Sequence, residues 1–396
     1  MQRLLSGIKP SGDLNIGGYG GALRQYVKLQ HEYESYFFVP DLHAITVYQD
    51  PVELHQRTRD IAALYIASGI NPDKATIFLQ SQVPAHVELG WLLETQAHFG
   101  ELKRMTQFKE KSDGKDTVSS ALFTYPVLMA ADVLLYQATH VPVGDDQKQH
   151  LELTRDVAER FNNRYGRTFT VPEPIIQDIG SRVMGLDDPS KKMSKSNPNK
   201  NSCVHMMDTP EDIRKKFSRA VTDSDGQVRH DWEQKPAVSN LIEIYSVFSE
   251  EAISVIEKRY EGQGYGTFKK ELAEVVIEKL QPIQERFHQI VNSSELDRIM
   301  MDGAKRGFRN RWPNTACRQE SDGIGHVLKE PRGRPLDSCF LIGNQNKGRP
   351  AYFCWLAFDV GHKLLRSLVC PTSLSPYGSS YSRLIYWNAC HDLWPS

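Results

Sequence analysis

Short apolar runs alternate with amphipathic segments along the first half of the chain. The runs at residues 36–39 and 76–79 have the length and composition of buried strands. Between them, apolar residues recur every three or four positions, as in the helix that we expect to begin after Asp50 and to end at Gly69. Strands that alternate with helices in this way predict an α/β fold, a doubly wound parallel sheet, over residues 1–186.

The pattern becomes helical after residue 186. Apolar residues recur at three- and four-residue spacing from Leu272 to Val291, which predicts one long amphipathic helix. We therefore expect a smaller, mainly helical domain over residues 187–304. From residue 305 to 396 the periodicity is lost among scattered Gly, Pro, Cys and Trp, and five of the six cysteines lie there. We interpret residues 305–396 as an atypical tail, unrelated to the rest or translated out of frame, with an appended module as the alternative.

Composition narrows the class of protein. The chain has 48 Lys and Arg residues against 49 Asp and Glu residues, so a nucleic-acid surface would have to be a local patch. No apolar run has the length of a membrane span and no secretory signal precedes the first strand, so we expect a cytoplasmic protein with no membrane partner. No pair of cysteines has the spacing of a zinc or redox motif, and we expect no metal held by the protein itself.

Two segments have the chemistry of a phosphate site. The first strand ends in a turn at residues 9–11, and a helix then opens at Gly17 and Gly18, which points backbone N–H groups and a positive dipole end at an anion. The second segment, residues 192–196, carries two lysines three positions apart on a loop rich in Gly, Ser and Pro, a cationic clamp suited to a triphosphate. Close helix packing and a solvated basic loop are the alternative interpretations of these segments.

Together, the two segments resemble the signature motifs of class I aminoacyl-tRNA synthetases. Residues 192–196 read KMSKS, letter for letter the family's loop, and residues 15–18 resemble a degenerate form of its HIGH motif. Further segments resemble the bacterial tryptophanyl branch of the family: residues 21–25, 43–46, 100–109, 128–132, 141–144 and 146–150. The resemblance covers about residues 6–304. It implies a Rossmann-like catalytic domain, followed by the KMSKS loop and a helical domain that binds the anticodon end of tRNA.

The resemblance also implies that ATP, carrying Mg²⁺, binds at the two motifs. Its implied catalytic residues are Lys192, Lys195 and Lys111, which would neutralise charge on the leaving pyrophosphate. The residues that it implies for ATP binding are Lys9, Pro10, Ser11, Gly17, Gly18, Gly144, Asp145, Asp146, Val183, Lys192, Met193, Ser194, Lys195 and Ser196.

Asp132 is the only charged residue in the apolar segment 126–136. A buried, unpaired carboxylate costs several kcal/mol, so this side chain needs a donor. A nearby arginine or backbone N–H is one candidate, whereas the resemblance implies that Asp132 accepts the indole N–H of tryptophan. Around the same substrate the resemblance implies Met129, Val141 and Val143 as apolar walls, Tyr125 and Gln147 at the amino acid's polar end, and His43 as a further hydrogen-bonding group.

The implied function is ATP-dependent activation of L-tryptophan to tryptophanyl-adenylate and its transfer to tRNA(Trp), in a family whose members are typically homodimers. Two alternatives remain open: a tyrosyl-type synthetase, and a synthetase-like RNA-binding protein with impaired catalysis. The second rests on the atypical tail and on Asn15 and Gly18, which stand where the family usually has Thr and Asn. Lys9 is a further departure, at a position where the family usually has Gln. The family's terminal helix, which would begin near Gly303, is also expected to be missing here.

Overall fold

The structure is a computed structural model that describes residues 2–114, 117–144, 147–176, 183–194 and 197–310. The chain divides into two compact units, residues 1–321 and residues 322–396, and every described residue belongs to the first unit. The predicted boundary between residues 186 and 187, and the predicted nature of the tail, stay predictions. Among the described residues, no helix is both long and apolar enough to cross a membrane.

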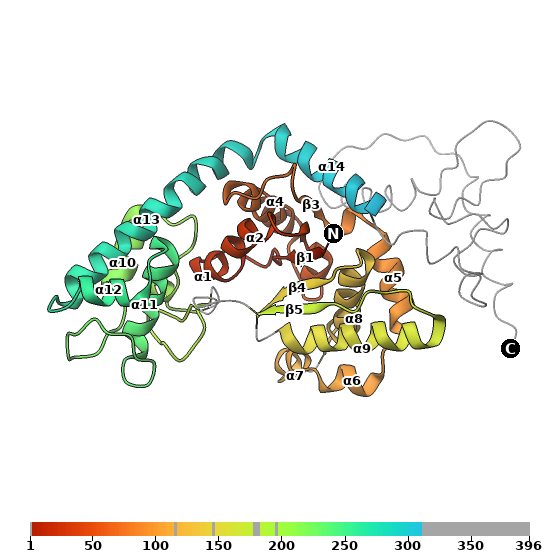
Figure 1. The fold of residues 1–396 in the computed structure, drawn as a ribbon, viewed down its shortest axis with the longest axis horizontal. Coiled ribbons are helices and arrows are strands. Elements are labelled where there is room, and N and C mark those ends of the chain that lie inside the picture. The colour runs from red at the N-terminus through yellow and green to blue at the C-terminus, as the bar shows by residue number, and fades with distance from the viewer. Residues whose placement is uncertain (1, 115–116, 145–146, 177–182, 195–196, 311–396) are drawn as a thin grey trace, which may run out of the picture. The chain divides into compact units, whose positions relative to one another are not determined.

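Five parallel strands form the centre of the fold (Figure 1). They are β1 (Arg3–Gly7), β2 (Glu34–Val39), β3 (Thr76–Leu79), β4 (His140–Val143) and β5 (Glu173–Ile176), in the spatial order β3-β2-β1-β4-β5. Strands β2 and β3 are added on one side of β1, and strands β4 and β5 are then added on the other side of β1. This confirms the predicted doubly wound sheet. In such sheets ligands bind beyond the carboxyl ends of the strands, where the strand order reverses.

Helices connect the strands as the amphipathic pattern predicts. Asp50 begins α4 by accepting hydrogen bonds from the N–H groups of Val52 (2.9 Å) and Glu53 (3.0 Å), and Gly69 follows the helix with a φ of +109°. The described helices before β5 are α1 (Ile16–Gly18), a π-helical turn η1 (Tyr19–Leu23), α2 (Arg24–Leu29), α3 (Asp41–Ala44), α4 (Pro51–Ala67), the 3-10 turn η2 (Gln80–Gln82), α5 (Ala85–Glu94), α6 (Phe99–Arg104), α7 (Thr106–Ser112), α8 (Ser120–Leu135) and α9 (Lys148–Tyr165).

The remaining described helices are η4 (Lys200–Ser202), α10 (Pro210–Ser218), α11 (Pro236–Ser249), α12 (Ile253–Arg259), α13 (Tyr265–Ile290) and α14 (Ser294–Asn310). The apolar stripe predicted between Leu272 and Val291 is the buried face of α13. One core cluster joins side chains of β1, β2, α2 and α4 to those of α10, α11 and α13. Burial of this shared apolar surface holds the helical region to the sheet.

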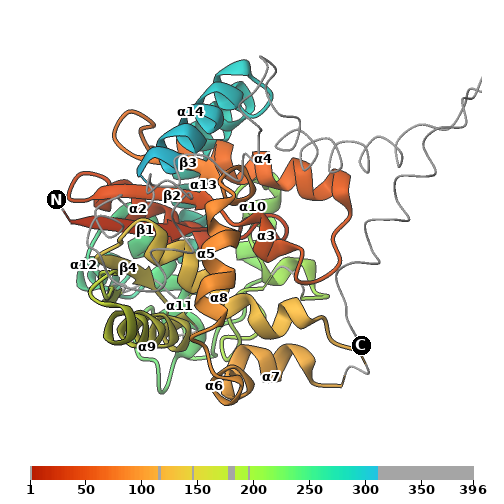
Figure 2. The ribbon, with the colours of Figure 1, turned by 90° about the vertical axis from the view of Figure 1, so that its right-hand side faces the viewer.

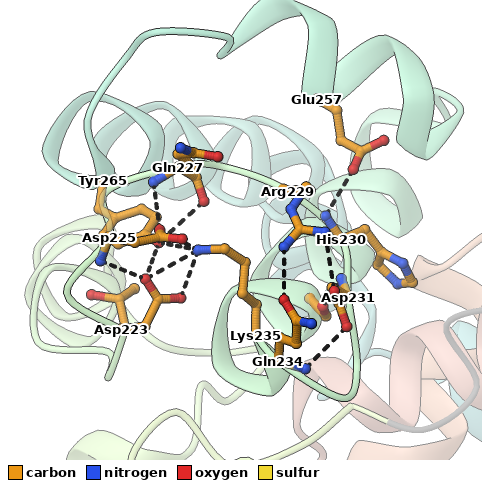
Figure 3. Close-up of polar contacts among 12 residues, drawn as sticks. Asp223, Asp225, Gln227, Arg229, His230, Asp231, Gln234, Lys235, Glu257 and Tyr265 are labelled. Atoms are coloured by element: carbon orange, nitrogen blue, oxygen red, sulfur yellow. Dashed lines mark hydrogen bonds and ion pairs between the residues drawn. The ribbon is translucent and has the colours of Figure 1, made fainter.

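The loop before α11 is fixed by a buried lysine (Figure 3). Lys235, which is 3% exposed, forms ion pairs with Asp223 (3.0 Å) and Asp225, and it contacts the hydroxyl of Tyr265 at 3.0 Å. The Tyr265 hydroxyl donates a hydrogen bond to Asp223 as well. A buried ammonium group needs such partners, so this network stabilises the loop and the start of α11.

The prediction that helical structure is lost from residue 305 is wrong for residues 305–310, which are helical. The predicted absence of a terminal helix beyond them falls outside the described residues. Helix α14 continues to Asn310 and packs along the edge strand β3 (Figure 2). Gly303 is essential to that approach, because a Cβ there would lie 1.6 Å from the carbonyl oxygen of Ile77. Gly307, one turn later, faces the Tyr136 hydroxyl, and Arg306 donates a hydrogen bond to the Pro72 carbonyl at 2.8 Å. The two glycines that interrupt the apolar pattern are what allow close packing.

Candidate active site

A cavity of about 340 Å³ opens at the carboxyl ends of β1, β2 and β4. The residues that line it come from these three strands, from the segments that follow them, and from helices α2, α7 and α8. Of the residues predicted for the site, the structure brings together in this cavity Lys9, His43, Lys111, Tyr125, Met129, Asp132, Val141, Val143, Gly144 and Gln147. Its position is the switch point of the sheet, where ligand sites of this fold lie.

Asp132 lies at the floor of the cavity and is only 1% exposed. Its Oδ1 accepts hydrogen bonds from Gln80 Nε2 (2.7 Å) and His86 Nδ1 (2.6 Å), and its Oδ2 accepts one from His43 Nε2 (2.8 Å). Three side chains therefore supply the donors that the buried carboxylate requires. No arginine and no backbone N–H is among these three donors.

These donors keep the carboxylate charged. Burial raises the pKa of Asp132, the hydrogen bonds from His43 and His86 lower it, and the net result is a lowered pKa. Two carboxylate oxygens offer about four acceptor positions. Since the protein occupies two positions on Oδ1 and one on Oδ2, the open acceptor position belongs to Oδ2, the oxygen shared with His43.

Sequence reasoning missed Gln80 and His86. Gln80 comes directly after β3, just as residues 40–43 come directly after β2. A polar residue at the carboxyl end of a parallel strand could therefore have been predicted to face the site. Asp41 connects the two turns, because its Oδ1 accepts a hydrogen bond from the Ser81 N–H at 3.0 Å. Burial raises the pKa of Asp41, and the hydrogen bonds from Ser81 act in the opposite direction. His86 lies on α5 with no neighbouring motif, so only the tertiary structure reveals it.

The cavity is apolar along its walls and cationic near its mouth. Val141 and Val143 on β4 are buried, and Met129 lies on the same helix as Asp132. Tyr125 shares a hydrogen bond with His150 Nε2 at 2.8 Å, and the Lys111 ammonium lies 5.4 Å from the centre of the Tyr125 ring. Such a cavity suits a ligand with a flat apolar body, one N–H or O–H donor at its far end and an anionic group near the lysines.

The two sequence motifs contact each other. Met193 donates its N–H to the Val183 carbonyl at 2.9 Å, so that Lys192 and Met193 pair with residues 183–184 as a short antiparallel hairpin. Asn15 Nδ2 donates to the Met193 carbonyl at 3.3 Å, which joins residues 178 positions apart in the sequence. A Cβ at Gly17 would lie 3.2 Å from Val183 Cβ, so the glycine permits this approach. Lys192 and Ser194 are exposed on the loop.

The N–H of Gly18 has a different partner from the one predicted. The sequence predicts that it faces a phosphate, but it donates to Asn15 Oδ1 at 3.0 Å, because asparagine is a strong N-cap and begins α1 here. Pro10 is buried, and Ser11 lines a second, polar hollow of about 720 Å³ together with Arg57, Lys200 and Lys215. Four of the predicted ATP residues, Asp145, Asp146, Lys195 and Ser196, lie outside the described residues.

Comparison with known proteins agrees with this arrangement. Residues 1–281 match the model of the family described as tRNA synthetases class I (W and Y). The chain belongs to this family. The parallel sheet is thus the Rossmann-like core of a class I synthetase.

Relatives of this synthetase share more than half of its aligned residues. It is 56% identical over 306 residues to the tryptophan–tRNA ligase of Caldanaerobacter subterraneus subsp. tengcongensis, covering 77% of this chain and 93% of that protein. It is 53% identical over 324 residues to the tryptophan–tRNA ligase of Bacillus subtilis, covering 82% of this chain and 98% of that protein. The alignments therefore cover nearly the whole length of these two relatives but only about four fifths of this chain.

Solved structures show the same fold. The tryptophanyl-tRNA synthetase of Mycoplasma pneumoniae is 36% identical, with a TM-score of 0.73, over 78% of this chain and 94% of that one. The tryptophanyl-tRNA synthetase of Campylobacter jejuni, solved in complex with ADP and tryptophan, is also 36% identical, with a TM-score of 0.67, over 78% of this chain and 96% of that one.

Proposed function

We propose that this class I synthetase is a tryptophan–tRNA ligase, which activates L-tryptophan with ATP and transfers it to tRNA(Trp). The single observation that carries the proposal is the buried Asp132 carboxylate at the floor of an apolar cavity, with an open acceptor position on Oδ2. The relatives with more than 50% identity are tryptophan–tRNA ligases, which favours this function over a tyrosyl-type synthetase or an RNA-binding protein without catalysis.

The cavity supports tryptophan as the ligand in three ways. The indole N–H would donate to Asp132 Oδ2, while Met129, Val141 and Val143 would contact the ring. Tyr125, Gln147 and His43 would address the polar end, where Lys9 and Lys111 add positive charge near the carboxylate of the substrate. A ligand that lacks a donor at its far end would leave the desolvated Asp132 oxygen unpaired, which is costly.

ATP would bind where the two motifs meet. The predicted contacts are the turn at residues 9–11, Gly17, Gly144 and the KMSKS hairpin, with Val183 and Met193 beneath the nucleotide and Mg²⁺ entering on its phosphates. Asp145 and Asp146 would accept the ribose hydroxyls. Gly18 would take part through the shape of the turn, because its N–H already donates to the Asn15 side chain that caps α1.

The reaction then needs alignment more than proton transfer. An oxygen of the tryptophan carboxylate forms a bond to the α-phosphorus of ATP, the bond from that phosphorus to the bridging oxygen breaks, and pyrophosphate leaves with the electron pair. The carboxylate is already ionised at neutral pH, so no general base is required. Lys192, Lys195 and Lys111 would stabilise the charge that develops on the pyrophosphate. In the transfer step, the oxygen of the terminal ribose hydroxyl of tRNA(Trp) forms a bond to the carbonyl carbon of the adenylate. The bond from that carbon to the phosphate oxygen breaks, AMP leaves with the electron pair, and the hydroxyl proton passes to the AMP phosphate or to water.

We also propose that two copies of the chain associate. Val87 and Trp91 lie one turn apart on α5 and are 54% and 71% exposed, an unusual position for large apolar side chains. A second copy of the chain is the partner that the resemblance implies. A Trp91→Glu variant should shift the protein toward a monomer in analytical ultracentrifugation, whereas an unchanged sedimentation coefficient would place the interface elsewhere.

Charging of tRNA tests the proposed function as a whole. The purified chain should attach radiolabelled tryptophan, and not tyrosine, to a tRNA(Trp) transcript in the presence of ATP and Mg²⁺. Attachment of tyrosine would establish the tyrosyl-type alternative. No attachment of either amino acid, with tRNA binding retained, would establish the RNA-binding alternative.

A further inference from the structure

A chain of buried hydrogen bonds extends from Asp132 away from the cavity. His86 Nδ1 contacts Asp132 Oδ1 at 2.6 Å, and the opposite nitrogen, Nε2, contacts the Tyr136 hydroxyl at 2.9 Å. His86 and Tyr136 are both fully buried, and neither lines the cavity. Neither side chain has a part in the proposed reaction, yet both place polar atoms in the core, where an apolar residue would avoid the desolvation cost.

The direction of these hydrogen bonds follows from the carboxylate. An ionised Asp132 can only accept, so His86 Nδ1 must carry a proton. With Nδ1 protonated, a neutral imidazole leaves Nε2 as an acceptor, and the Tyr136 hydroxyl can donate to it. The hydroxyl thus favours the one neutral tautomer of His86 that donates to Asp132.

Tyr136 is itself held in place from two sides. Its ring stacks on Tyr36 with centroids 4.9 Å apart and an interplanar angle of 24°. Its hydroxyl faces Gly307 on α14, where an added Cβ would lie 3.3 Å from the hydroxyl oxygen. Helix α14 therefore covers the far end of the chain Asp132–His86–Tyr136.

The two oxygens of Asp132 consequently differ in function. Oδ1 is occupied by Gln80 and His86, which are both fully buried, whereas Oδ2 has only His43, which lines the cavity. Two donors behind the carboxylate fix its rotation about the side-chain bond. The oxygen with the open acceptor position is thereby turned to the ligand before the ligand binds, which lowers the cost of ordering on binding.

We propose that His86, oriented by Tyr136 beneath α14, is a positioning residue that keeps Asp132 an ionised acceptor turned toward the indole N–H and so sets selectivity for that group. The proposal rests on the proposed function, because it takes tryptophan as the ligand. It assigns a specificity role to two residues that do not touch the substrate.

The preference for a ligand with an indole N–H distinguishes a positioning role of His86 from a purely structural role. The test compares tryptophan with 3-benzothienylalanine, in which sulfur replaces the indole N–H, by measuring kcat/KM of the full chain in ATP–pyrophosphate exchange. His86→Leu removes the donor to Asp132, and His86→Asn offers an amide where Nδ1 stood. Tyr136→Phe removes only the hydroxyl. Tyr260→Phe, a buried tyrosine outside the cavity, is the matched control.

We expect His86→Leu to lower kcat/KM for tryptophan by roughly ten- to hundredfold, the effect of a lost hydrogen bond to a charged group, and to change the value for the sulfur analogue by less than about threefold. His86→Asn should restore most of the loss. Tyr136→Phe should lower the preference for tryptophan in the same direction by a smaller factor, and Tyr260→Phe should leave it unchanged. If His86→Leu does not fold, Tyr136→Phe, which keeps the ring, decides alone.

An equal fall for both substrates, or an unchanged preference in folded His86→Leu and Tyr136→Phe, would overturn the positioning role. A wild-type chain that uses both substrates equally, together with an Asp132→Asn variant that is no different, would overturn the proposed function as well. The two failures are therefore distinguishable.

Discussion

Replacing Asp132 by Asn tests how the cavity recognises its ligand. The substitution keeps the shape of the side chain but converts one acceptor oxygen into an NH₂ donor. If the amide oxygen of the variant faces Gln80 and His86, its NH₂ faces His43 and the ligand, where a donor is wrong for an indole N–H. If the amide turns over, its NH₂ faces the donors Gln80 and His86 instead. Neither orientation satisfies every partner.

The magnitude follows from the contacts. Losing a hydrogen bond to a charged acceptor costs about 1.5–3 kcal/mol, so tryptophan should bind more weakly by roughly ten- to hundredfold. The same substitution should affect stability. Because three protein side chains donate to the buried carboxylate, we expect the free energy of unfolding to fall by about 1–3 kcal/mol as well.

The assay measures both quantities on one variant. Isothermal titration gives the Kd for tryptophan, and urea denaturation gives the free energy of unfolding. Asp223→Asn is the matched control, because Asp223 also accepts hydrogen bonds from several side chains but lies outside the cavity. It should lose stability and keep its affinity for tryptophan. An Asp132→Asn variant that loses stability while its Kd for tryptophan stays at the wild-type value would refute the reasoning and make Asp132 a structural residue.

Three other predictions concern the motifs and the tail. The double variant Lys192→Ala and Lys195→Ala should lower the rate of tryptophan activation by about a hundred- to thousandfold, because these lysines act on the leaving pyrophosphate. Its affinity for tryptophan should change little. An unchanged rate of ATP–pyrophosphate exchange would remove both lysines from the mechanism. Gly18→Asn should lower the KM for ATP by adding a side-chain donor at the turn, because the one atom within 3.0 Å of the new Cβ would be Leu14 Cδ1 (2.4 Å), the end of a flexible side chain that can change rotamer. A raised KM would show that the turn does not adapt. A chain that ends at Asn310 should keep tryptophan activation and gain solubility. A chain that ends at residue 302 should unfold at a lower temperature, because it loses the contacts of Gly303 and the following residues of α14 with β3. Equal melting temperatures of the two truncated chains would contradict this role of α14.

The sheet and the cavity residues could be predicted because their signals are local. Apolar runs such as Tyr36–Val39 identify strands without knowledge of their neighbours, and parallel strands bring their carboxyl ends to one edge. Lys9, His43 and Gly144 each follow a strand closely, so their meeting in one cavity follows from the fold class.

The rest could not be predicted because it depends on tertiary packing. Gln80 and His86 become partners of Asp132 only when η2 and α5 are placed beside α8. The last turns of α14, beyond residue 304, were missed for a related reason. Gly303 and Gly307 lower the helix propensity of the segment, and their value lies in the close contact with β3, which no periodicity in the sequence displays.

Tryptophan-dependent exchange of pyrophosphate into ATP tests the central claim most directly, because it requires the amino acid site and the ATP motifs together and needs no tRNA. The full chain with ATP, Mg²⁺ and labelled pyrophosphate should form labelled ATP when L-tryptophan is added and should not when L-tyrosine replaces it. Exchange that depends on tyrosine, or no exchange with either amino acid from a folded chain, would contradict the account.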